Sequence, residues 1–220
     1  MSVAICLLVW GDYWERFGSM FIDNVSRLNP QPNEVIISSP EPLDLPDHWQ
    51  NIVEPHHKWN SWNNTMLAAK SEWVIPFSVD DEWFTNALDV VTGVEDDVQI
   101  IAFACMQNGQ HWGATRAGLE SILDVPHNPM LGGAIFRRSI FPTILYRQVV
   151  WNDWIQWMEI RKLGLKVVFK NEPIMNHIRH PGAYSAQPNS NGELQCEQMR
   201  AILRVHDVVP GIEFPPEILK

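Results

Sequence analysis

The sequence predicts a single α/β domain with a mainly parallel, mixed sheet that is flanked by helices on both faces. Short apolar runs typical of buried strands alternate along the chain with segments of helical periodicity. The 220 residues, 45% of them apolar, can bury a full core, and no Gly/Ser-rich or charged linker divides them. We therefore expect one folding unit over residues 1–190, with a C-terminal helix and a Pro-rich tail over residues 191–220 packed on it.

The first elements of the chain have the pattern of two strands with a helix between them. The apolar run over residues 3–9 predicts the first strand, and apolar and aromatic side chains from Tyr13 to Leu28 then recur at helical spacing. Asn29-Pro30 ends this helix, because proline cannot continue it. A second strand is expected over residues 34–38, and the Pro- and Asp-rich stretch 40–47 has the composition of a loop.

The later elements continue the alternation of strands and helices. We expect a helix over about 61–70, a strand over 73–77, a helix over 83–91, strands over 99–104 and 130–136, a helix over 153–163, a strand over 166–169 and a helix over 193–205. Sheets built in this way bind their ligands at the carboxyl ends of the parallel strands. The residues that follow each strand are therefore the first candidates for a functional site.

Composition and charge exclude several classes of protein. A formal net charge of −10, without any run of Lys or Arg, is unsuited to binding a nucleic-acid backbone. Three widely spaced cysteines argue against a disulfide framework and against a structural zinc site, and they fit a reducing cytoplasm. The apolar run over residues 3–9 is too short to span a bilayer. We expect a cytoplasmic protein without a membrane span, in which bound phosphate needs a metal ion.

A group of carboxylates follows the buried strand over residues 73–77. Asp80, Asp81 and Glu82 come directly after its last apolar side chains. Mg²⁺ and Mn²⁺ take oxygen ligands and keep coordination positions open for phosphate. The sequence therefore predicts a divalent-cation site at this strand end and chemistry on a diphosphate. Asp80 or Asp81 could instead cap a helix that begins near Trp83, since Asp is a favoured N-cap residue.

Five segments occur in an order that resembles a known family. They are Asn64-x-x-Leu67-x-x-Lys70-Ser71-Glu72-Trp73, then Val79-Asp80-Asp81-Glu82, then Leu131-Gly132-Gly133-Ala134-Ile135-Phe136-Arg137-Arg138, then Asn152-Asp153-Trp154-Ile155-Gln156-Trp157, and finally Glu172-Pro173-Ile174 through His180-Pro181-Gly182-Ala183-Tyr184-Ser185. Over roughly residues 3 to 186 the chain resembles the family 2 inverting glycosyltransferases of the GT-A fold, which are nucleotide-diphospho-sugar transferases.

The resemblance implies a GT-A-like catalytic domain over residues 1–190. Such a domain moves a sugar from a nucleotide-diphosphate donor to a hydroxyl group of a glycan or another acceptor, with inversion at the anomeric carbon. The implied ligands of an Mn²⁺ or Mg²⁺ cofactor are Asp81, Glu82 and His180. The implied donor-binding residues are Asp80, Asp81, His180, Trp10 and Asn64. The implied acceptor-side residues are Gly132, Gly133, Trp83 and Trp154, and the implied general base is Asp153.

Physical chemistry adds conditions to two of these roles. A carboxyl group is a weak base at its reference pKa of about 3.9, so burial of Asp153 beside Trp151, Trp154 and Trp157 would help by disfavouring its charged form. The lack of side chains at Gly132-Gly133 would let the backbone approach a sugar closely. We therefore expect Asp153 to be buried and the two glycines to face the acceptor.

Simpler interpretations of the same residues stay open. Asp153 could act only as an N-cap of its helix, and His180 before Pro181-Gly182 could be a turn or surface residue. His177 is expected to be structural. Most of the 11 Trp residues are expected in the core, although an exposed Trp59, Trp62, Trp83 or Trp112 could pack on a sugar ring. Arg137 and Arg138 are expected at the solvated surface rather than on phosphate.

Departures from the family pattern leave a second function open. Ser38-Ser39-Pro40 stands where the family commonly has an Asp that holds the nucleoside, Val79 stands at the first carboxylate of the Asp-x-Asp motif, and Asn152 stands where Glu is frequent. A non-catalytic sugar or nucleotide-sugar binding module of the same fold would tolerate these changes. A Rossmann-type methyltransferase or dehydrogenase is disfavoured, because Val9-Trp10-Gly11-Asp12 lacks the required Gly-rich turn.

Overall fold

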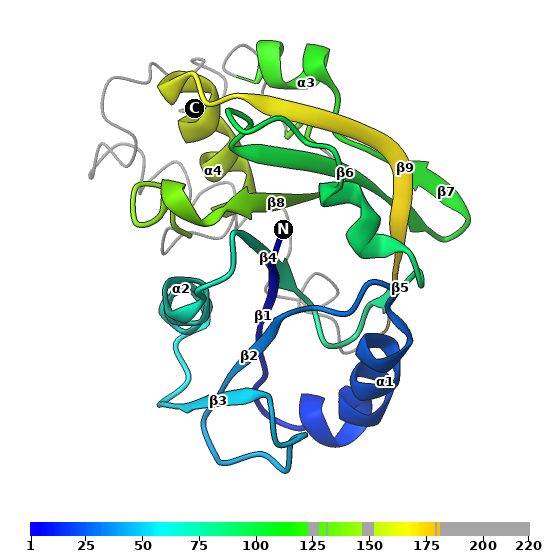
Figure 1. The fold of residues 1–220 in the computed structure, drawn as a ribbon, viewed down its shortest axis with the longest axis vertical. Coiled ribbons are helices and arrows are strands. Elements are labelled where there is room, and N and C mark those ends of the chain that lie inside the picture. Colours follow the sequence, from blue (N-terminus) through cyan, green and yellow to red (C-terminus); the bar gives the residue numbers. More distant parts are fainter. Residues whose placement is uncertain (123–127, 131, 147–151, 179, 181–220) are drawn as a thin grey trace.

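The residues that the computed structural model describes are 1–122, 128–130, 132–146, 152–178 and 180 (Figure 1). Their strands are β1 (Val3–Leu8), β2 (Glu34–Ser39), β3 (Gln50–Val53), β4 (Trp73–Phe77), β5 (Glu82–Trp83), β6 (Ile100–Gln107), β7 (Gln110–Trp112), β8 (Gly133–Arg137) and β9 (Val167–His177). Their helices are α1 (Tyr13–Arg27), α2 (Lys58–Ala68), α3 (Arg116–Ser121) and α4 (Asn152–Leu163), with 3₁₀ helices η1 (Ala87–Val91) and η2 (Arg138–Ile140). The helix and tail expected over 191–220 lie outside the described residues.

The strands form one mixed sheet in the order β3-β2-β1-β4-β8-β6-β9-β5, with β7 paired to β6. β1 to β4 run parallel to one another, as do β6 and β9, whereas β8 is antiparallel to both β4 and β6. Leu8 pairs with Ser38, and Leu7 pairs with Phe77, so the carboxyl ends of β1, β2 and β4 meet at one edge. The predicted α/β fold with a mainly parallel sheet is confirmed.

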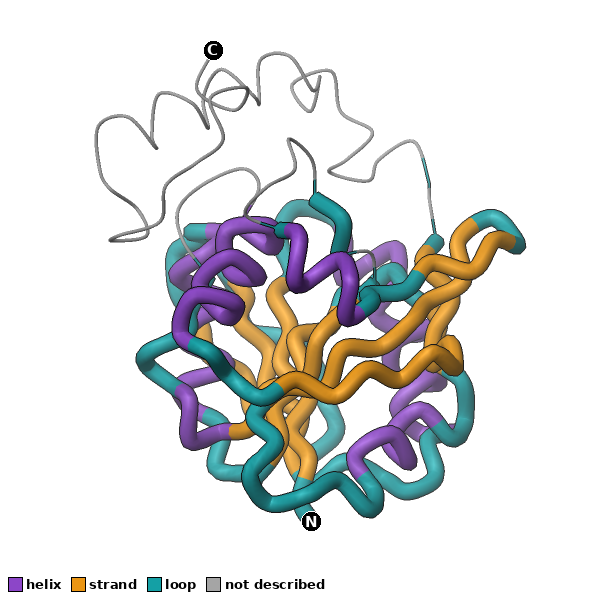
Figure 2. The backbone as a smooth tube through the Cα atoms, turned by 90° about the horizontal axis from the view of Figure 1, so that it is seen from above, coloured by secondary structure: helices purple, strands orange, loops and turns teal. Residues whose placement is uncertain are grey.

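Side chains of β1 alternate between two core layers, because successive residues of a strand point to opposite faces of the sheet. Cys6 packs in one layer with Met66 of α2 and Met158 of α4. Leu7 packs in the other layer with Phe21 of α1. Helices cover both faces of the sheet, as Figure 2 shows, so the predicted two-sided covering is also confirmed.

Arg137 and Arg138 attach β8 to the amino end of β4. The Nη1 atom of Arg137 lies 2.6 Å from Oε1 of Glu72, and its guanidinium lies 4.4 Å from the ring centroid of Trp73. The Nε atom of Arg138 donates to the carbonyl oxygen of Ala69 at 2.7 Å. The Arg137 side chain is only 14% exposed, so the expected solvated position is wrong for this residue. Both arginines lie away from the carboxyl edge of β4.

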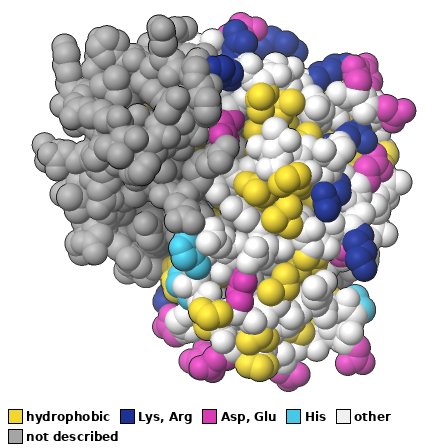
Figure 3. Space-filling model, turned by 90° about the vertical axis from the view of Figure 1, so that its left-hand side faces the viewer, with side chains coloured by type: hydrophobic (Ala, Val, Ile, Leu, Met, Phe, Trp, Pro, Cys, Tyr) yellow, Lys and Arg dark blue, Asp and Glu magenta, His cyan; other side chains and the backbone are white. Residues whose placement is uncertain are grey.

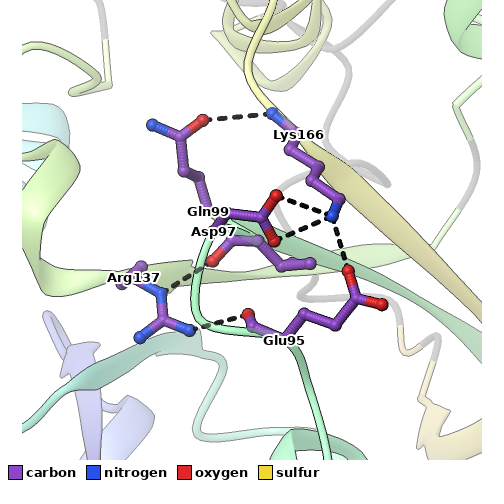
Figure 4. Close-up of polar contacts among 6 residues, drawn as sticks. Glu95, Asp97, Gln99, Arg137 and Lys166 are labelled. Carbon is purple, nitrogen blue, oxygen red and sulfur yellow. Dashed lines mark hydrogen bonds and ion pairs between the residues drawn. The ribbon is translucent and has the colours of Figure 1, made fainter.

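A second polar network joins the loop before β6 to the start of β9 (Figure 4). The Nζ atom of Lys166 lies 2.6 Å from Oε2 of Glu95 and 2.7 Å from Oδ1 of Asp97, and the Lys166 backbone N–H donates to Oε1 of Gln99 at 3.1 Å. The Nη2 atom of Arg137 donates to the backbone carbonyl of Glu95 at 3.2 Å. The hydrogen bond from Lys166 lowers the pKa of Asp97, and the hydrogen bonds to Asp97 and Glu95 raise the pKa of Lys166, because each contact favours the charged forms of its partners.

β9 is longer than the strand expected over 166–169, and an irregular pairing with β6 bends it. Phe103 pairs with Lys170, but the next residue of β6, Ala104, pairs with Pro173. Two residues of β9 therefore have no partner on β6 at this bulge. In Figure 1 the strand curves from the α4 side of the molecule towards β5, with which its last residues pair.

Two sequence predictions around β4 are wrong. The chain over 50–53 forms β3 although no strand was expected there, and the helix expected over 83–91 is replaced by β5 and η1. Trp83 pairs with Met175, more than 90 residues away in the sequence. Such a tertiary pairing overrides the local helical pattern, since strand formation depends mainly on neighbouring strands. An N-cap role for Asp80 or Asp81 is excluded with it, because no helix begins after them.

The described surface is mixed in charge. On the face drawn in Figure 3, Lys and Arg side chains are scattered and have Asp and Glu among them. Large apolar side chains that are exposed in the described residues are few and separated, namely Met1, Val53, Leu67 and Leu163. None of the described helices combines the length and the hydropathy that a bilayer crossing needs.

Candidate functional site

The turn after β4 carries two neighbouring carboxylates that point to different surroundings. Asp81 is 4% exposed, and its Oδ1 accepts the backbone N–H of Ile178 at 3.0 Å and lies 2.9 Å from Nδ1 of His177. The Asp81 carbonyl oxygen accepts from Nδ2 of Asn24 on α1 at 3.0 Å. Asp81 therefore ties the turn to the end of β9 and to α1.

Burial raises the pKa of Asp81, and the hydrogen bond from His177 opposes that shift. One of its two oxygens is already engaged by protein donors. The geometry of Asp81 is thus that of a residue that positions the turn. The sequence singled out Asp81 as a metal ligand and His177 as structural, but it gave no sign that the two side chains meet.

Asp80, in contrast, meets the predicted donor-site residue His180. Oδ2 of Asp80 lies 2.9 Å from Nε2 of His180, and the two side chains are 16% and 12% exposed. The His180 ring packs against Phe17 of α1 with 4.9 Å between ring centroids, and against Tyr13 with 6.0 Å. The structure therefore brings together two sequence-predicted residues, and His180 is not a freely solvated turn residue.

The third carboxylate of the turn has a structural partner. Oε2 of Glu82 accepts from Nδ2 of Asn176 at 3.0 Å, across the pairing of β5 with β9. This hydrogen bond fixes the side chain beside the sheet edge. Glu82, which the sequence placed among the metal ligands, makes no contact with His180 that the described residues record.

A pocket of about 450 Å³ opens where β1 and β2 end. Trp10, Gly11 and Trp14 form one wall of it, and Ser39 and Glu41 lie on the other. Trp10 stacks on Tyr13 at 4.9 Å and on His56 at 5.2 Å between ring centroids. Trp10 was predicted to bind the donor, and it lines a concave surface at the edge where ligands of such sheets bind.

Asn64, the other predicted donor residue, contacts a carboxylate that sequence reasoning missed. Nδ2 of Asn64 donates to Oε2 of Glu54 at 2.7 Å, and the hydroxyl of Ser38 donates to Oε1 of the same residue at 2.7 Å. Glu54 directly follows β3, which the sequence did not predict. A carboxylate therefore does lie next to Ser38, although it comes from the neighbouring strand.

Two predicted acceptor-side tryptophans are part of the core. Trp83 is 4% exposed and stacks on Phe77 with 4.1 Å between centroids. Trp154 is 5% exposed and packs with the layer that contains α2 and α4. The expected exposure of Trp83 is wrong, because pairing of β5 with β9 turns its indole inward. Core packing, which was the simpler interpretation, accounts for both side chains.

Packing against Phe103 accounts for Gly133, the first residue of β8, and for Gly132 directly before it. Gly132 has a φ of +102°, and a Cβ at this position would collide with the carbonyl oxygen of Phe103. A Cβ on Gly133 would collide with the Phe103 ring. The glycines thus let β8 lie close to β6, which is a sufficient reason for them without a bound sugar.

Asp153 lies in the first turn of α4, and its side chain is exposed. Its Oδ2 accepts from Nδ2 of Asn128 at 3.0 Å. Burial raises the pKa of Tyr146, and the Asp153 charge raises it further, so the two side chains are near each other. The expectation that Asp153 is buried is wrong, and of the three expected neighbours Trp151 lies outside the described residues.

Comparisons with known proteins give matches in structure only. No family model matches the chain, and no curated protein matches it in sequence. The fold of TarS from S. aureus, solved with UDP-GlcNAc, is similar over 100% of this chain and 70% of that one, with a TM-score of 0.67 and 13% identity. The mannosyltransferase PcManGT of Pyrobaculum calidifontis, solved with GDP-Man and Mn²⁺, matches over 98% and 66% with a TM-score of 0.61 and 15% identity.

A third similar structure is glucosyl-3-phosphoglycerate synthase of Mycobacterium tuberculosis, solved with Mn²⁺, UDP and phosphoglyceric acid. It matches over 92% of this chain and 78% of its own, with a TM-score of 0.59 and 14% identity. All three are nucleotide-sugar glycosyltransferases of GT-A type. The chain has the GT-A fold. At this level of sequence identity the likeness establishes the fold, and the site must be argued from its own residues.

The donor set of this GT-A domain allows two protein ligands for a divalent cation. Asp80 offers a carboxylate oxygen and His180 an imidazole nitrogen, and both are ligand types that Mn²⁺ accepts. Among the described residues, no group of three or more His, Cys, Asp or Glu side chains is arranged to hold a metal ion. Mg²⁺ is commonly bound by one or two carboxylates together with substrate phosphates and water, so Asp80 is a suitable ligand type for such a cation, and His180 lies beside it.

Proposed function

We propose that this chain transfers a sugar from a nucleotide-diphosphate donor to a hydroxyl group. The observation that carries the proposal is the Asp80–His180 pair at the same sheet edge as the Trp10 pocket, in a GT-A fold. A cation-binding pair and an aromatic pocket are what a charged diphosphate and a flat nucleobase require. Similar structures that bind UDP-GlcNAc and GDP-Man support this donor class.

The nucleotide would occupy the pocket beside Trp10. The Trp10 indole lines this pocket as an apolar contact for a base, and its stacking on Tyr13 and His56 restricts its orientation. Asn64 and Glu54 lie near the ends of β2 and β3 as hydrogen-bonding groups for sugar hydroxyls. Glu54 would supply the carboxylate that Ser38-Ser39-Pro40, at the end of β2, lacks.

Asp80 and His180 would hold the divalent cation, with Mn²⁺ as the first choice. When bound, the cation supplies positive charge that offsets the charge of the departing diphosphate. Asp81, which the sequence placed first among the ligands, would position the turn through His177 and Ile178. Glu82 would do the same through Asn176.

Asp153 would act as the general base of an inverting reaction. The acceptor oxygen forms its bond to the anomeric carbon while the bond from that carbon to the diphosphate oxygen breaks, and the electron pair leaves with the diphosphate. The acceptor hydroxyl proton passes to the Asp153 carboxylate. The exposed Asp153 carboxylate is open to an acceptor hydroxyl group from solvent.

Thermal unfolding with a panel of nucleotide-sugars tests the proposal, because a ligand that binds only the folded state raises the midpoint temperature. UDP- and GDP-sugars, each with and without Mn²⁺, are the first probes. We expect at least one of them to stabilise the protein, and Mn²⁺ to increase the shift. Absence of any shift over the whole panel would contradict the proposal.

A non-catalytic nucleotide-sugar binding module is the second candidate. The exposure of Asp153 favours it, since the environment expected for a strengthened base is not present. Both candidates predict donor binding, but only the transferase predicts turnover. Release of nucleotide from the stabilising donor, lost in Asp153→Asn with donor binding kept, distinguishes them.

A further inference from the structure

Arg16, which plays no part in the site described so far, lies directly beside the Asp80–His180 pair. Its Nη2 atom is 3.5 Å from Nδ1 of His180, whose other ring nitrogen faces Asp80. It belongs to the first turn of α1. Only the His180 ring thus separates Arg16 from Asp80, at the proposed cation position.

The surroundings of Arg16 hold its guanidinium in place but do not bind it in a short ion pair. The Cζ atom lies 4.8 Å from the ring centroid of Phe17 and 5.7 Å from that of Tyr13, so aromatic rings support the planar group. The ion pair with Asp12 is long, at 3.6 Å, and the two side chains are 39% and 62% exposed. Such an exposed pair contributes little stability, so structural support alone does not account for this arginine.

The acidic charge of the sheet edge suggests what Arg16 could do chemically. Asp12, Glu54 and Asp80 make this edge acidic, and Asp80 already contributes to raising the pKa of Tyr13, after the larger effect of burial. A diphosphate carries several negative charges and would be repelled by these carboxylates. A guanidinium offers paired N–H donors that match phosphate oxygens, and it stays charged at every relevant pH.

We propose that Arg16 is a diphosphate-binding residue of the donor site and contacts the phosphate next to the cation held by Asp80 and His180. The inference rests on the proposed function and goes beyond it by assigning this residue. Arg16 would leave its weak contacts with Asp12 and His180 and donate to the phosphate oxygens. It would also stabilise the charge that builds on the diphosphate as the bond to the sugar breaks.

The test compares a nucleoside diphosphate with its monophosphate. Binding of UDP, UMP, GDP and GMP is measured by calorimetry in the presence of Mn²⁺ for the wild type, Arg16→Gln and Arg16→Lys. We expect Arg16→Gln to weaken diphosphate binding at least about tenfold, as lost charge-assisted hydrogen bonds do, and to change monophosphate binding by less than about twofold. Arg16→Lys keeps the charge but not the paired donors, and it should fall between the two.

Arg116→Gln is the matched control. Its guanidinium also lies over an aromatic ring, 5.8 Å from the centroid of Phe169, but α3 is at the opposite end of the molecule from α1 (Figure 1). It should bind all four nucleotides like the wild type. The midpoint of thermal unfolding shows that each variant is folded, and the charge-retaining Arg16→Lys provides the comparison should Arg16→Gln be destabilised.

The outcomes separate the inference from the proposed function. If the wild type binds none of the four nucleotides, the proposed function fails and the inference falls with it. If the wild type binds diphosphates and Arg16→Gln binds them equally well, the inference is overturned while the proposed function stands. Equal losses for diphosphates and monophosphates would also overturn it, because they would indicate a general change of the pocket.

Discussion

Nε2 of His180 lies 2.9 Å from Oδ2 of Asp80, although the two residues are 100 positions apart in the sequence. The turn after β4 supplies the carboxylate, and the segment after β9 supplies the imidazole. This contact makes the carboxyl edge of the sheet a shared site of two distant parts of the chain. Predictions about function therefore start with this pair.

Asp80→Asn is expected to remove the Mn²⁺-dependent part of donor binding. An amide is a weaker ligand for a hard cation than a carboxylate, so the extra stabilisation that Mn²⁺ gives with a UDP- or GDP-sugar should disappear. Thermal unfolding with and without Mn²⁺ measures it. Asp89→Asn, an exposed change on η1, should behave like the wild type. An unchanged Mn²⁺ effect in Asp80→Asn would contradict the assignment of this ligand.

Asp81→Ala is expected to lower the free energy of unfolding by about 1–3 kcal/mol, because the part-buried N–H of Ile178 and the ring of His177 lose this carboxylate as a hydrogen-bond partner. Asp81→Asn should lose less, since its amide oxygen can still accept from Ile178. Urea unfolding of both variants measures the difference. Asp81 would have no structural role if Asp81→Ala were as stable as the wild type.

Trp10→Ala is expected to weaken nucleotide binding by about 1–3 kcal/mol, the contribution of stacking between a base and an aromatic ring. The loss should be the same for UDP and UMP, in contrast with Arg16→Gln. Trp112→Ala, on the β7 hairpin, serves as the control for loss of an indole. A loss confined to UDP would mean that Trp10 senses phosphate and does not contact the base.

Gly132→Ala is expected to lower the free energy of unfolding by about 1–3 kcal/mol, because the φ of +102° is unfavourable for alanine and its Cβ meets the carbonyl of Phe103. Gly109 has a φ of +74° but open space around it. Gly109→Ala should therefore lower the free energy of unfolding only through the unfavourable positive φ, without a collision. Chemical denaturation of the two variants separates strain from collision, and equal losses would argue against the collision.

Acid should weaken the Lys166–Asp97 ion pair. The pKa of Asp97 is lower in the folded than in the unfolded protein, so its contribution to stability is present above its ordinary pKa of 3.8 and is lost as pH falls through the folded value. Lys166→Met removes this term. The stability difference between wild type and Lys166→Met should shrink on the acid side of about pH 4. A difference that does not change with pH there would contradict this account.

Local patterns predicted the elements whose packing is regular. Apolar spacing identified α1, and short buried runs identified β1, β2 and β4, because each of these has one environment along its length. β3 and β5 were not predicted, since both are short and depend on pairing, β3 with the preceding strand β2 and β5 with β9 far away in the sequence. For that reason the sequence also gave no sign of Glu54 at the end of β3.

The sequence predicted the location of the site, at the end of β4, but not the contacts that its side chains make. The acidic turn and His180 were correctly brought to one edge, but the roles of Asp80 and Asp81 depend on which way each carboxylate points. Only the packing of the turn against β9 decides that. Arg16 had no motif at all, and its position beside His180 is a contact between residues 164 positions apart in the sequence.

The bulge in β9 determines which side chain reaches Asp81. Side chains of a strand alternate between faces, so removing one residue between Lys170 and Pro173 would shift every later position by one and reverse its direction. His177 would then face away from Asp81, and Ile178 would take its place. The number of unpaired residues at the bulge, far from the turn, thus determines which side chain of β9 reaches Asp81. A change in that number would alter the contacts of the acidic turn without replacing any carboxylate.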